Sequence, residues 1–366
     1  MRRTVATAAL ALLACGPRAS ETSGLSGGSL VVSSSSSGDE STSSSTTTTT
    51  TSGSTGAAST SVGSDTAAAT GPKIDMGIPD LPSDQACNRK VDLVFVIGQH
   101  AYYHEHLDVL YGSYPGFIET MKEVFADIDL HVMVVTGDGE WGDQESCPKS
   151  MCPADGGCPA YGEDNDYPCW ALYEEGALSD CDNTHGAGVV FPAGEDAANK
   201  PCGLPDGRRY LEGDEPLFAE RFDCIARLGG TGGWFQYGWA IGEAVSVDLQ
   251  EGCNAGFLRE DALLFAVLFT SYDSSPYNPY AWAQRVLEAK GFNQDLVVAL
   301  GYGWDGGAVE PKLCEPQFPD DGPGAVYSWL EHFDHSFFGS ICAPSYVSPF
   351  VEAATVAAEL CEGGPG

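Results

Sequence analysis

The chain has 366 residues, a formal net charge of −35 at pH 7, and 43% hydrophobic residues. So acidic a chain repels phosphate backbones and anionic lipid headgroups, which excludes nucleic acid as a partner and excludes electrostatic binding to anionic membranes. Residues 1–86 hold seven acids and four bases, so −32 of the charge falls on residues 87–366. This charge either keeps the folded part soluble or attracts cations and basic partners.

Residues 1–14 have the pattern of an export signal. Arg2 and Arg3 precede an apolar run at residues 5–13, which is too short to span a bilayer. The sequence LLAC at residues 12–15 resembles the bacterial lipobox, which implies that Cys15 is lipidated and begins the mature protein. The alternative is an ordinary cleaved signal followed by a chance cysteine. With glycine rather than aspartate at position 16, the resemblance favours the outer membrane of a Gram-negative bacterium, with the lipid anchor as the only membrane contact.

Residues 15–86 are expected to form a disordered stalk. Serine fills positions 33–37 and threonine fills positions 46–51, and large apolar residues are almost absent. Such a segment buries too little apolar surface to offset the entropy lost on ordering. The 72 residues from Cys15 to Cys87 give a flexible chain a root-mean-square reach of roughly 45–50 Å. The stalk would hold the folded part away from the membrane.

The folded part, residues 87–366, reads as alternating strands and helices. Apolar runs predict strands at residues 91–97, 130–136, 262–270 and 296–300. Periodic segments predict helices at residues 104–125 with an interruption near Pro115, 237–247, 280–289 and 349–361. Because the strands are apolar throughout, the pattern indicates an α/β fold with three layers: a doubly wound, mostly parallel sheet covered by helices on both faces. We expect one domain with an irregular insertion at about residues 138–223.

Twelve cysteines remain after Cys15, an even number that indicates disulfides in an exported protein. They are Cys87, Cys147, Cys152, Cys158, Cys169, Cys181, Cys202, Cys224, Cys253, Cys314, Cys342 and Cys361. Six of them lie within residues 147–202, where little core can form, so disulfides are expected to hold the insertion. A zinc knuckle is the rival interpretation of the first four cysteines in that stretch, but no CxxC spacing supports it.

Several motifs occur in the order expected of one family. They are VDLVFVI after a cysteine, FIETM, LHVMVVTGD, FDCIARLGGTGG, CNAGFLREDALLFAVLFTSYD and FGSICAPSY. On these motifs the chain resembles a von Willebrand factor A-like domain of the bacterial, lipid-anchored, cysteine-rich kind. The resemblance implies one short antiparallel edge strand, a ligand site at the carboxyl ends of the strands, and a Cys87–Cys361 disulfide, because the two ends of such domains lie close together. We also expect Cys314 to pair with Cys342.

The metal site of that family is degenerate in this sequence. In the family, an Asp-x-Ser-x-Ser loop after the first strand binds Mg²⁺ or Mn²⁺ together with a later threonine and aspartate, as suits a hard cation. The corresponding positions here are Gly98, His100, Tyr102, Thr231 and Ser271. Only Thr231 keeps the family's residue, and both carboxylates are missing. We therefore expect no metal and no cofactor at this site.

A histidine-based zinc site is the first alternative. His104, His106 and Asp108 match the His-x-His-x-Asp core of the metallo-β-lactamase-type motif, and His100 lies four residues before His104. Such a site would make the protein a zinc-dependent surface hydrolase. On a helix, however, side chains two residues apart point about 200° apart and cannot share an ion. The simpler interpretation is a helix with polar, partly exposed histidines.

A calcium-stabilised structural module is the second alternative. The acidic loops at residues 138–143 and 162–166 are rich in oxygen ligands, but neither has EF-hand spacing, and solvated acidic loops are the simpler interpretation. Aromatic residues lie among these loops and form either a local core or a contact surface: Trp141, Tyr161, Tyr167 and Trp170. Residues 87–366 contain no G-x-S-x-G, P-loop or HExxH motif. We therefore expect a cell-surface lipoprotein that binds an extracellular protein or glycan, for adhesion or surface assembly, without catalysis.

Overall fold

The computed structural model describes most of the chain from Cys87 onward. The described residues are 87–98, 104–137, 139–142, 147, 150, 168–194, 196–229, 236–270, 278–306, 313–314 and 324–362, and the side chains of residues 104 and 105 are not included. All of them belong to one unit, Ile74–Gly366.

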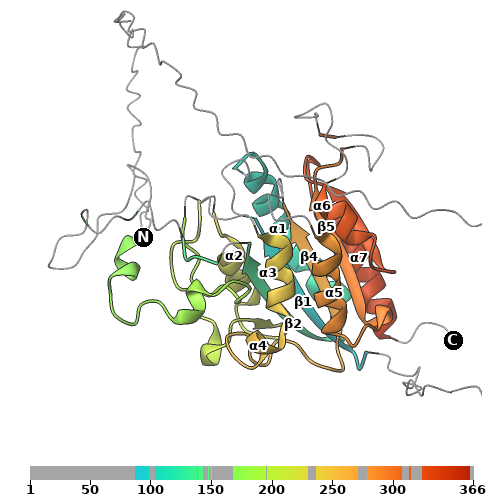
Figure 1. Ribbon diagram of the computed structural model, residues 1–366, viewed down its shortest axis with the longest axis horizontal. Coiled ribbons are helices and arrows are strands. Elements are labelled where there is room, and N and C mark those ends of the chain that lie inside the picture. The colour runs from blue at the N-terminus through green and yellow to red at the C-terminus, as the bar shows by residue number, and fades with distance from the viewer. Residues whose placement is uncertain are drawn as a thin grey trace, which may run out of the picture. The chain divides into compact units, whose positions relative to one another are not determined.

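A six-stranded sheet in the order β3-β2-β1-β4-β5-β6 runs through this unit (Figure 1). The strands are β1 (Lys90–Ile97), β2 (Asp129–Thr136), β3 (Leu211–Glu212), β4 (Leu263–Phe269), β5 (Val297–Gly303) and β6 (Ser336–Ser340). All neighbouring strands pair in parallel except β3, which is a short antiparallel edge strand beside β2. The predicted mostly parallel α/β fold is confirmed.

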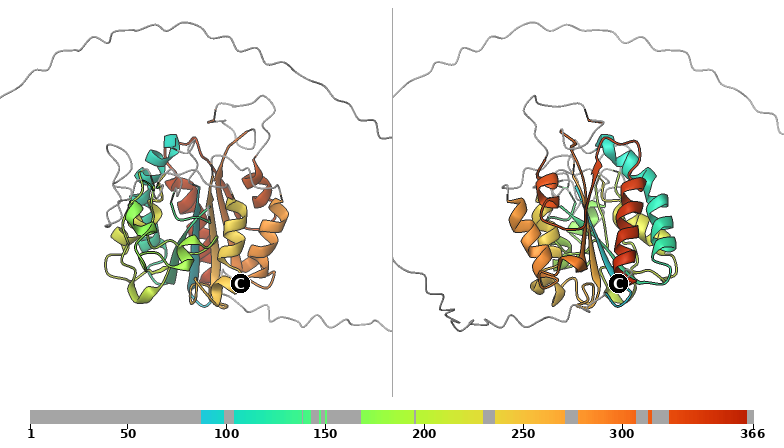
Figure 2. Two further views of the ribbon diagram at one scale, coloured as in Figure 1. Left: turned by 60° about the vertical axis from the view of Figure 1, so that its left-hand side comes forward. Right: turned by 90° about the vertical axis from the view of Figure 1, so that its right-hand side faces the viewer.

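Seven α-helices accompany the sheet within the described residues. They are α1 (His104–Val124), α2 (Phe218–Ala226), α3 (Tyr237–Ala244), α4 (Val247–Gln250), α5 (Pro279–Glu288), α6 (Ala325–Leu330) and α7 (Val347–Cys361). Figure 2 shows helices on both sides of the sheet. No helix among the described residues has the length and apolar character needed to cross a bilayer.

The strands bury both of their faces. In β1, Leu93 and Phe95 join one hydrophobic cluster with α1, α2 and α7, whereas Val94 and Val96 join a second cluster with α3, α5 and α6. Side chains alternate between the faces of a strand, so a strand covered on both sides is apolar at nearly every position, with Asp92 the exception in β1. This is why the strand sequences contain unbroken apolar runs.

Two helices differ from the prediction. The expected interruption of α1 near Pro115 is wrong, because the helix continues through this residue. Tyr114 and Phe117 lie on either side of Pro115 and are both buried in the first cluster, so tertiary packing holds the two halves in line. The predicted helix at residues 237–247 instead ends at Ala244, and the Ser246 hydroxyl accepts a hydrogen bond from the Leu249 amide at the start of α4.

A buried ionic network lies at the amino ends of the central strands. The Asp92 carboxylate on β1 accepts hydrogen bonds from the Arg259 amide (2.7 Å) and guanidinium (2.8 Å), and it lies 3.7 Å from the Lys290 ammonium. The side chains of Asp92 and Lys290 are fully buried. Burial raises the pKa of Asp92, while Lys290 and then Arg259 oppose that rise. Burial likewise lowers the pKa of Lys290. The charges of Asp92 and Lys290 are thus buried together and compensate each other.

Five disulfides connect the described cysteines: Cys87–Cys361, Cys147–Cys169, Cys181–Cys253, Cys202–Cys224 and Cys314–Cys342. The two pairings expected from the sequence are both present. Cys152 and Cys158 lie outside the described residues. Because Cys147 and Cys169 bond to each other, they are not ligands of a zinc knuckle. Disulfides at this density indicate an exported or extracellular protein.

Candidate functional site at the carboxyl ends of the strands

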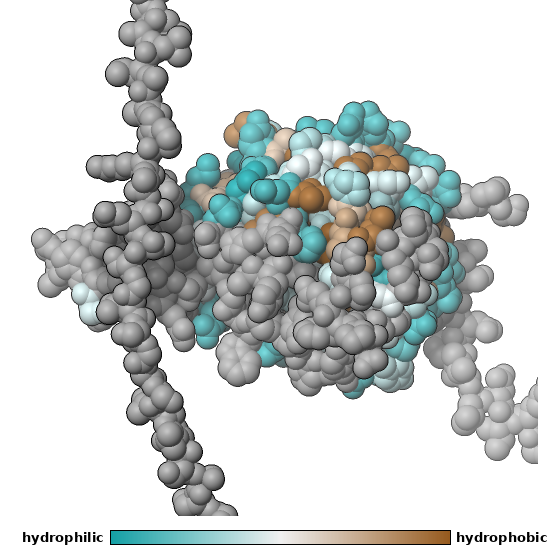
Figure 3. Space-filling model, turned by 90° about the horizontal axis from the view of Figure 1, so that it is seen from above, coloured by the Kyte–Doolittle hydropathy of each residue, from teal (hydrophilic) through white to brown (hydrophobic). Residues whose placement is uncertain are grey.

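The five parallel strands end along one edge of the sheet, where ligand sites of open α/β sheets form. Gly98 follows β1 and donates its amide to Phe269 O on β4, and Gly137 follows β2 and donates to Ile97 O on β1. On the other side of β4, the Thr270 amide donates to Tyr302 O on β5. Figure 3 looks onto this end of the unit, where hydrophobic residues, drawn brown, gather among hydrophilic ones.

The ring of Tyr237, the first residue of α3, fills the space above the ends of β1 and β2. A Cβ atom on Gly98 would lie 3.0 Å from the Tyr237 ring, and a Cβ atom on Gly137 would lie 1.8 Å from it. Tyr237 is only 3% exposed. Gly137 is therefore needed to admit the ring, and a Cβ on Gly98 would require the ring to shift by a few tenths of an ångström. Gly98 is also the position where the resemblance places a metal-binding aspartate, and the Tyr237 ring lies against it.

The other positions of the expected metal site cannot be compared in the same way. His100, Tyr102, Thr231 and Ser271 lie outside the described residues, as does Cys15. Residues 162–166 also lie outside them, and only residues 139–142 of the first acidic loop are described. Within the described part of the chain, no three His, Cys, Asp or Glu side chains are grouped so as to hold a metal ion.

The histidine motif lies on α1. His104 is the first residue of this helix and His106 follows two positions later. Positions two apart on an α-helix lie about 200° apart around its axis. His100 lies outside the described residues, and the described helix starts at His104. The geometry of α1 gives no support to the zinc-hydrolase alternative.

A different histidine, which the sequence did not single out, lies beside the Tyr237 ring. His185 comes from the disulfide-rich insertion, and its Cβ atom would lie 3.1 Å from a Cβ on Gly139. The adjacent Gly186 lies against α3, where an added Cβ would be 2.6 Å from Cβ of Glu243. Burial lowers the pKa of His185, while Glu243 and the backbone of Gly137 and Gln236 act in the opposite direction. The insertion thus contacts α3 at its start, near Gln236, and at its end, near Glu243.

We expect His185 to make the folded protein less stable as the solution is acidified. Its folded pKa lies below the ordinary 6.5, so the unfolded chain takes up the proton first as the pH falls through 6.5. The stability that neutral His185 gives is complete above 6.5 and is lost between 6.5 and the lower folded pKa. Urea unfolding at a series of pH values should show the wild type losing stability relative to His185→Gln between pH 7.5 and 5.5. Parallel curves for the two proteins would contradict this expectation.

A carboxylate does lie at the end of β5, but it binds the chain itself. Asp305 is 1% exposed. It accepts hydrogen bonds from the Leu313 amide (2.8 Å), the Cys314 amide (3.1 Å) and the Ser340 hydroxyl (2.7 Å). The Cys314–Cys342 disulfide joins the same two segments covalently. Asp305 therefore closes a loop against β6, and its oxygens are already occupied by these donors.

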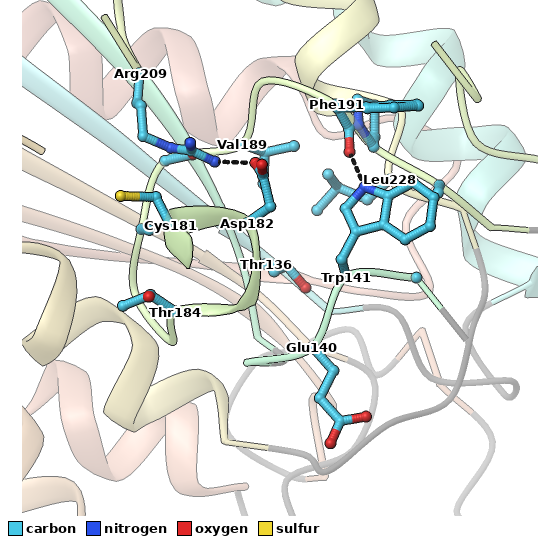
Figure 4. Close-up of a pocket in the computed structure, with 15 residues that line it drawn as sticks. Thr136, Glu140, Trp141, Cys181, Asp182, Thr184, Val189, Phe191, Arg209 and Leu228 are labelled. Carbon is cyan, nitrogen blue, oxygen red and sulfur yellow. Dashed lines mark hydrogen bonds and ion pairs between the residues drawn. The ribbon is translucent and has the colours of Figure 1, made fainter. Parts of the chain in front are cut away.

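A pocket opens between the end of β2 and the insertion (Figure 4), with about 390 Å³ of empty space that is partly open to solvent. Apolar walls come from Trp141, Val189, Phe191 and Leu228. On the other side, the Arg209 guanidinium donates to Asp182 (2.5 Å), as Figure 4 shows. Since Arg209 also donates to the Gly188 carbonyl (2.5 Å), its charge is satisfied internally. The pocket is small, with apolar side chains on one wall and hydroxyl and charged groups on the other.

The insertion has a small core of its own. Trp141, Cys147, Cys169 and Phe191 are buried together, and the Trp141 indole donates to the Phe191 carbonyl (2.7 Å). Trp141 therefore belongs to a local core, one of the two roles expected for the aromatic residues of the insertion. Trp170 is 39% exposed and remains available for contacts. Tyr161 and Tyr167 lie outside the described residues.

Comparisons with known proteins place the chain in no family. No protein-family model matches it, and neither does any curated protein. Among solved structures, proximal thread matrix protein 1 from the mussel byssus is similar at 12% sequence identity and a TM-score of 0.30. The match covers 75% of this chain and 49% of that protein, so it spans about half of the mussel protein's length. A likeness this low carries no argument about fold or function.

Proposed function

We propose that the chain is a lipoprotein of the bacterial cell surface, anchored through Cys15, with a von Willebrand factor A-like domain of three layers at residues 87–366. In this proposal the domain has lost its metal-dependent adhesion site. It acts in binding, adhesion or surface assembly without catalysis. Its partner is an extracellular protein or glycan.

The observation that carries the proposal is the Tyr237 ring above Gly98 and Gly137. An adhesion site of the family type needs a carboxylate from the first strand beside a coordinated cation. In this proposal the Tyr237 ring takes that space, since a Cβ on Gly98 would lie only 3.0 Å from it. Binding would then come from side chains and loops rather than from a metal bridge.

Support for the family comes from the sheet. The order β3-β2-β1-β4-β5-β6, with β3 as the antiparallel member, agrees with the edge strand that the resemblance implies. Support for a surface location comes from the five disulfides. In this proposal the lipobox provides the lipid anchor at Cys15. The stalk then holds the domain away from the membrane.

Metal content separates this proposal from its two rivals. We expect the purified full-length protein to contain no stoichiometric metal by mass spectrometry, and its unfolding temperature to be the same with and without EDTA. A ligand that binds only the folded state must raise that temperature, so an unchanged value reports an empty site. Stoichiometric zinc would favour the histidine-based hydrolase. Stoichiometric calcium, with a melting temperature lowered by EDTA, would favour the structural module.

A further inference from the structure

The insertion exposes two aromatic side chains on one side of a short 3-10 turn, η4 (Cys169–Leu172). Trp170 is 39% exposed, and Tyr173, three residues later, is 41% exposed. Cys169 and Ala171, on either side of Trp170 in the sequence, are buried. Residues three apart lie on the same side of a 3-10 turn, and Tyr173 is the residue that ends this turn, so both side chains leave the backbone from the same side. Glu174 and Glu175 follow directly and are both exposed. We call these four residues the aromatic platform.

The platform is held rigidly although it is exposed. The Tyr173 hydroxyl donates to the carbonyl of Cys147, and Cys147 is bonded to Cys169 at the start of the same turn. The Trp170 ring lies 6.1 Å from the Phe191 ring of the insertion's core. Exposed aromatic side chains fixed before binding lose little entropy when a partner arrives. Such anchors are typical of energetically important interface residues.

We propose that the aromatic platform docks an arginine-bearing segment of a partner protein, which deepens the proposed binding function and rests on it. A guanidinium stacks favourably on Trp and Tyr faces, and the carboxylates of Glu174 and Glu175 provide the opposite charge beside the rings. The net charge of −35 adds long-range attraction for a basic partner.

The same contact already occurs within this protein. The Arg285 guanidinium lies 4.4 Å from the centre of the Trp239 ring, and that of Arg227 lies 4.4 Å from the centre of the Tyr111 ring. In both cases a carboxylate completes the pair, Glu243 for Arg285 and Asp223 for Arg227. The platform presents the aromatic and acidic parts of this arrangement without an arginine among the contacts of the described residues.

The test uses the full-length protein and two octapeptides of alternating basic residue and glycine, one with arginine and one with lysine. We expect tighter binding of the arginine peptide. Trp170→Ala and Tyr173→Ala should each weaken it roughly two- to five-fold. Tyr173→Phe keeps the ring and should bind within two-fold of wild type. Calorimetric titration measures the affinities, and a thermal melt checks that each variant is folded.

The matched control is Tyr280→Ala, which removes an aromatic side chain that is 55% exposed on α5. None of these substitutions changes the net charge. If the peptide is held by charge alone, every variant will bind with the affinity of the wild type, and this result would overturn the proposal. Equal losses in Tyr280→Ala would also overturn it. A neutral cello-oligosaccharide that binds wild type but not Trp170→Ala, with peptide binding unaltered, would assign the platform to a glycan instead. Metal content is measured separately. A failure of peptide binding would therefore overturn the role of the platform without deciding whether the domain has a metal site.

Discussion

Asp92→Ala is expected to lower the free energy of unfolding by about 3–5 kcal/mol, because it leaves the buried Lys290 ammonium without its counter-charge. Asp92 is 0% exposed and accepts two hydrogen bonds from Arg259. The Lys290 ammonium beside it is also fully buried. It donates a hydrogen bond to the Arg259 carbonyl at 2.6 Å. Urea unfolding of the purified full-length protein gives the measurement.

A neighbouring ion pair supplies the control for this prediction. Lys90 and Asp261 are 2.7 Å apart with side chains 32% and 41% exposed. Asp261→Ala should cost less than about 1 kcal/mol, since solvent screens such pairs. The double variant Asp92→Ala with Lys290→Met should recover part of the stability lost in Asp92→Ala, because it removes an unpaired buried charge. Equal costs for Asp92→Ala and Asp261→Ala would show that the network is not a buried unit.

Gly137→Ala is expected to lower the free energy of unfolding by about 3 kcal/mol, at the upper end of the usual cost of overpacking a core. The added Cβ would lie 1.8 Å from the Tyr237 ring, so the ring and the start of α3 must move. Gly112→Ala on α1 is the matched control, because nothing lies within 4 Å of its added Cβ. Gly112→Ala should stabilise the protein by up to about 1 kcal/mol through helix propensity. Similar effects of the two substitutions would contradict the close approach of Tyr237.

The strands of the sheet were predictable because burial on both faces requires unbroken apolar sequence. The prediction of β1 at residues 91–97 misses only Lys90, and the strand at residues 262–270 extends one residue beyond β4 at each end. Shorter elements carry no such pattern. The edge strand β6, with sequence SFFGS, and the six-residue helix α6 are too brief for periodicity to identify them.

The residues of the candidate site were harder to predict, since they meet only through the fold. Tyr237 covers a glycine 100 positions earlier in the chain, and no local pattern records that contact. The available signal was the pair of glycines that end two adjacent strands, Gly98 and Gly137, which together leave space for one large ring. His185 and Asp305 gave no signal, because an isolated histidine or aspartate in a loop has many ordinary roles.

The most direct test of the central claim, that a tyrosine ring occupies the place of the metal site, is the coupling between residues 137 and 237. Gly137→Ala is measured in the wild type and again in Tyr237→Leu, where the ring is absent. We expect the cost of Gly137→Ala to fall from about 3 kcal/mol to below about 1 kcal/mol, because contacting residues do not contribute additively. The same cost in both backgrounds would mean that the ring does not fill this space, and the strand ends would again be open to a ligand.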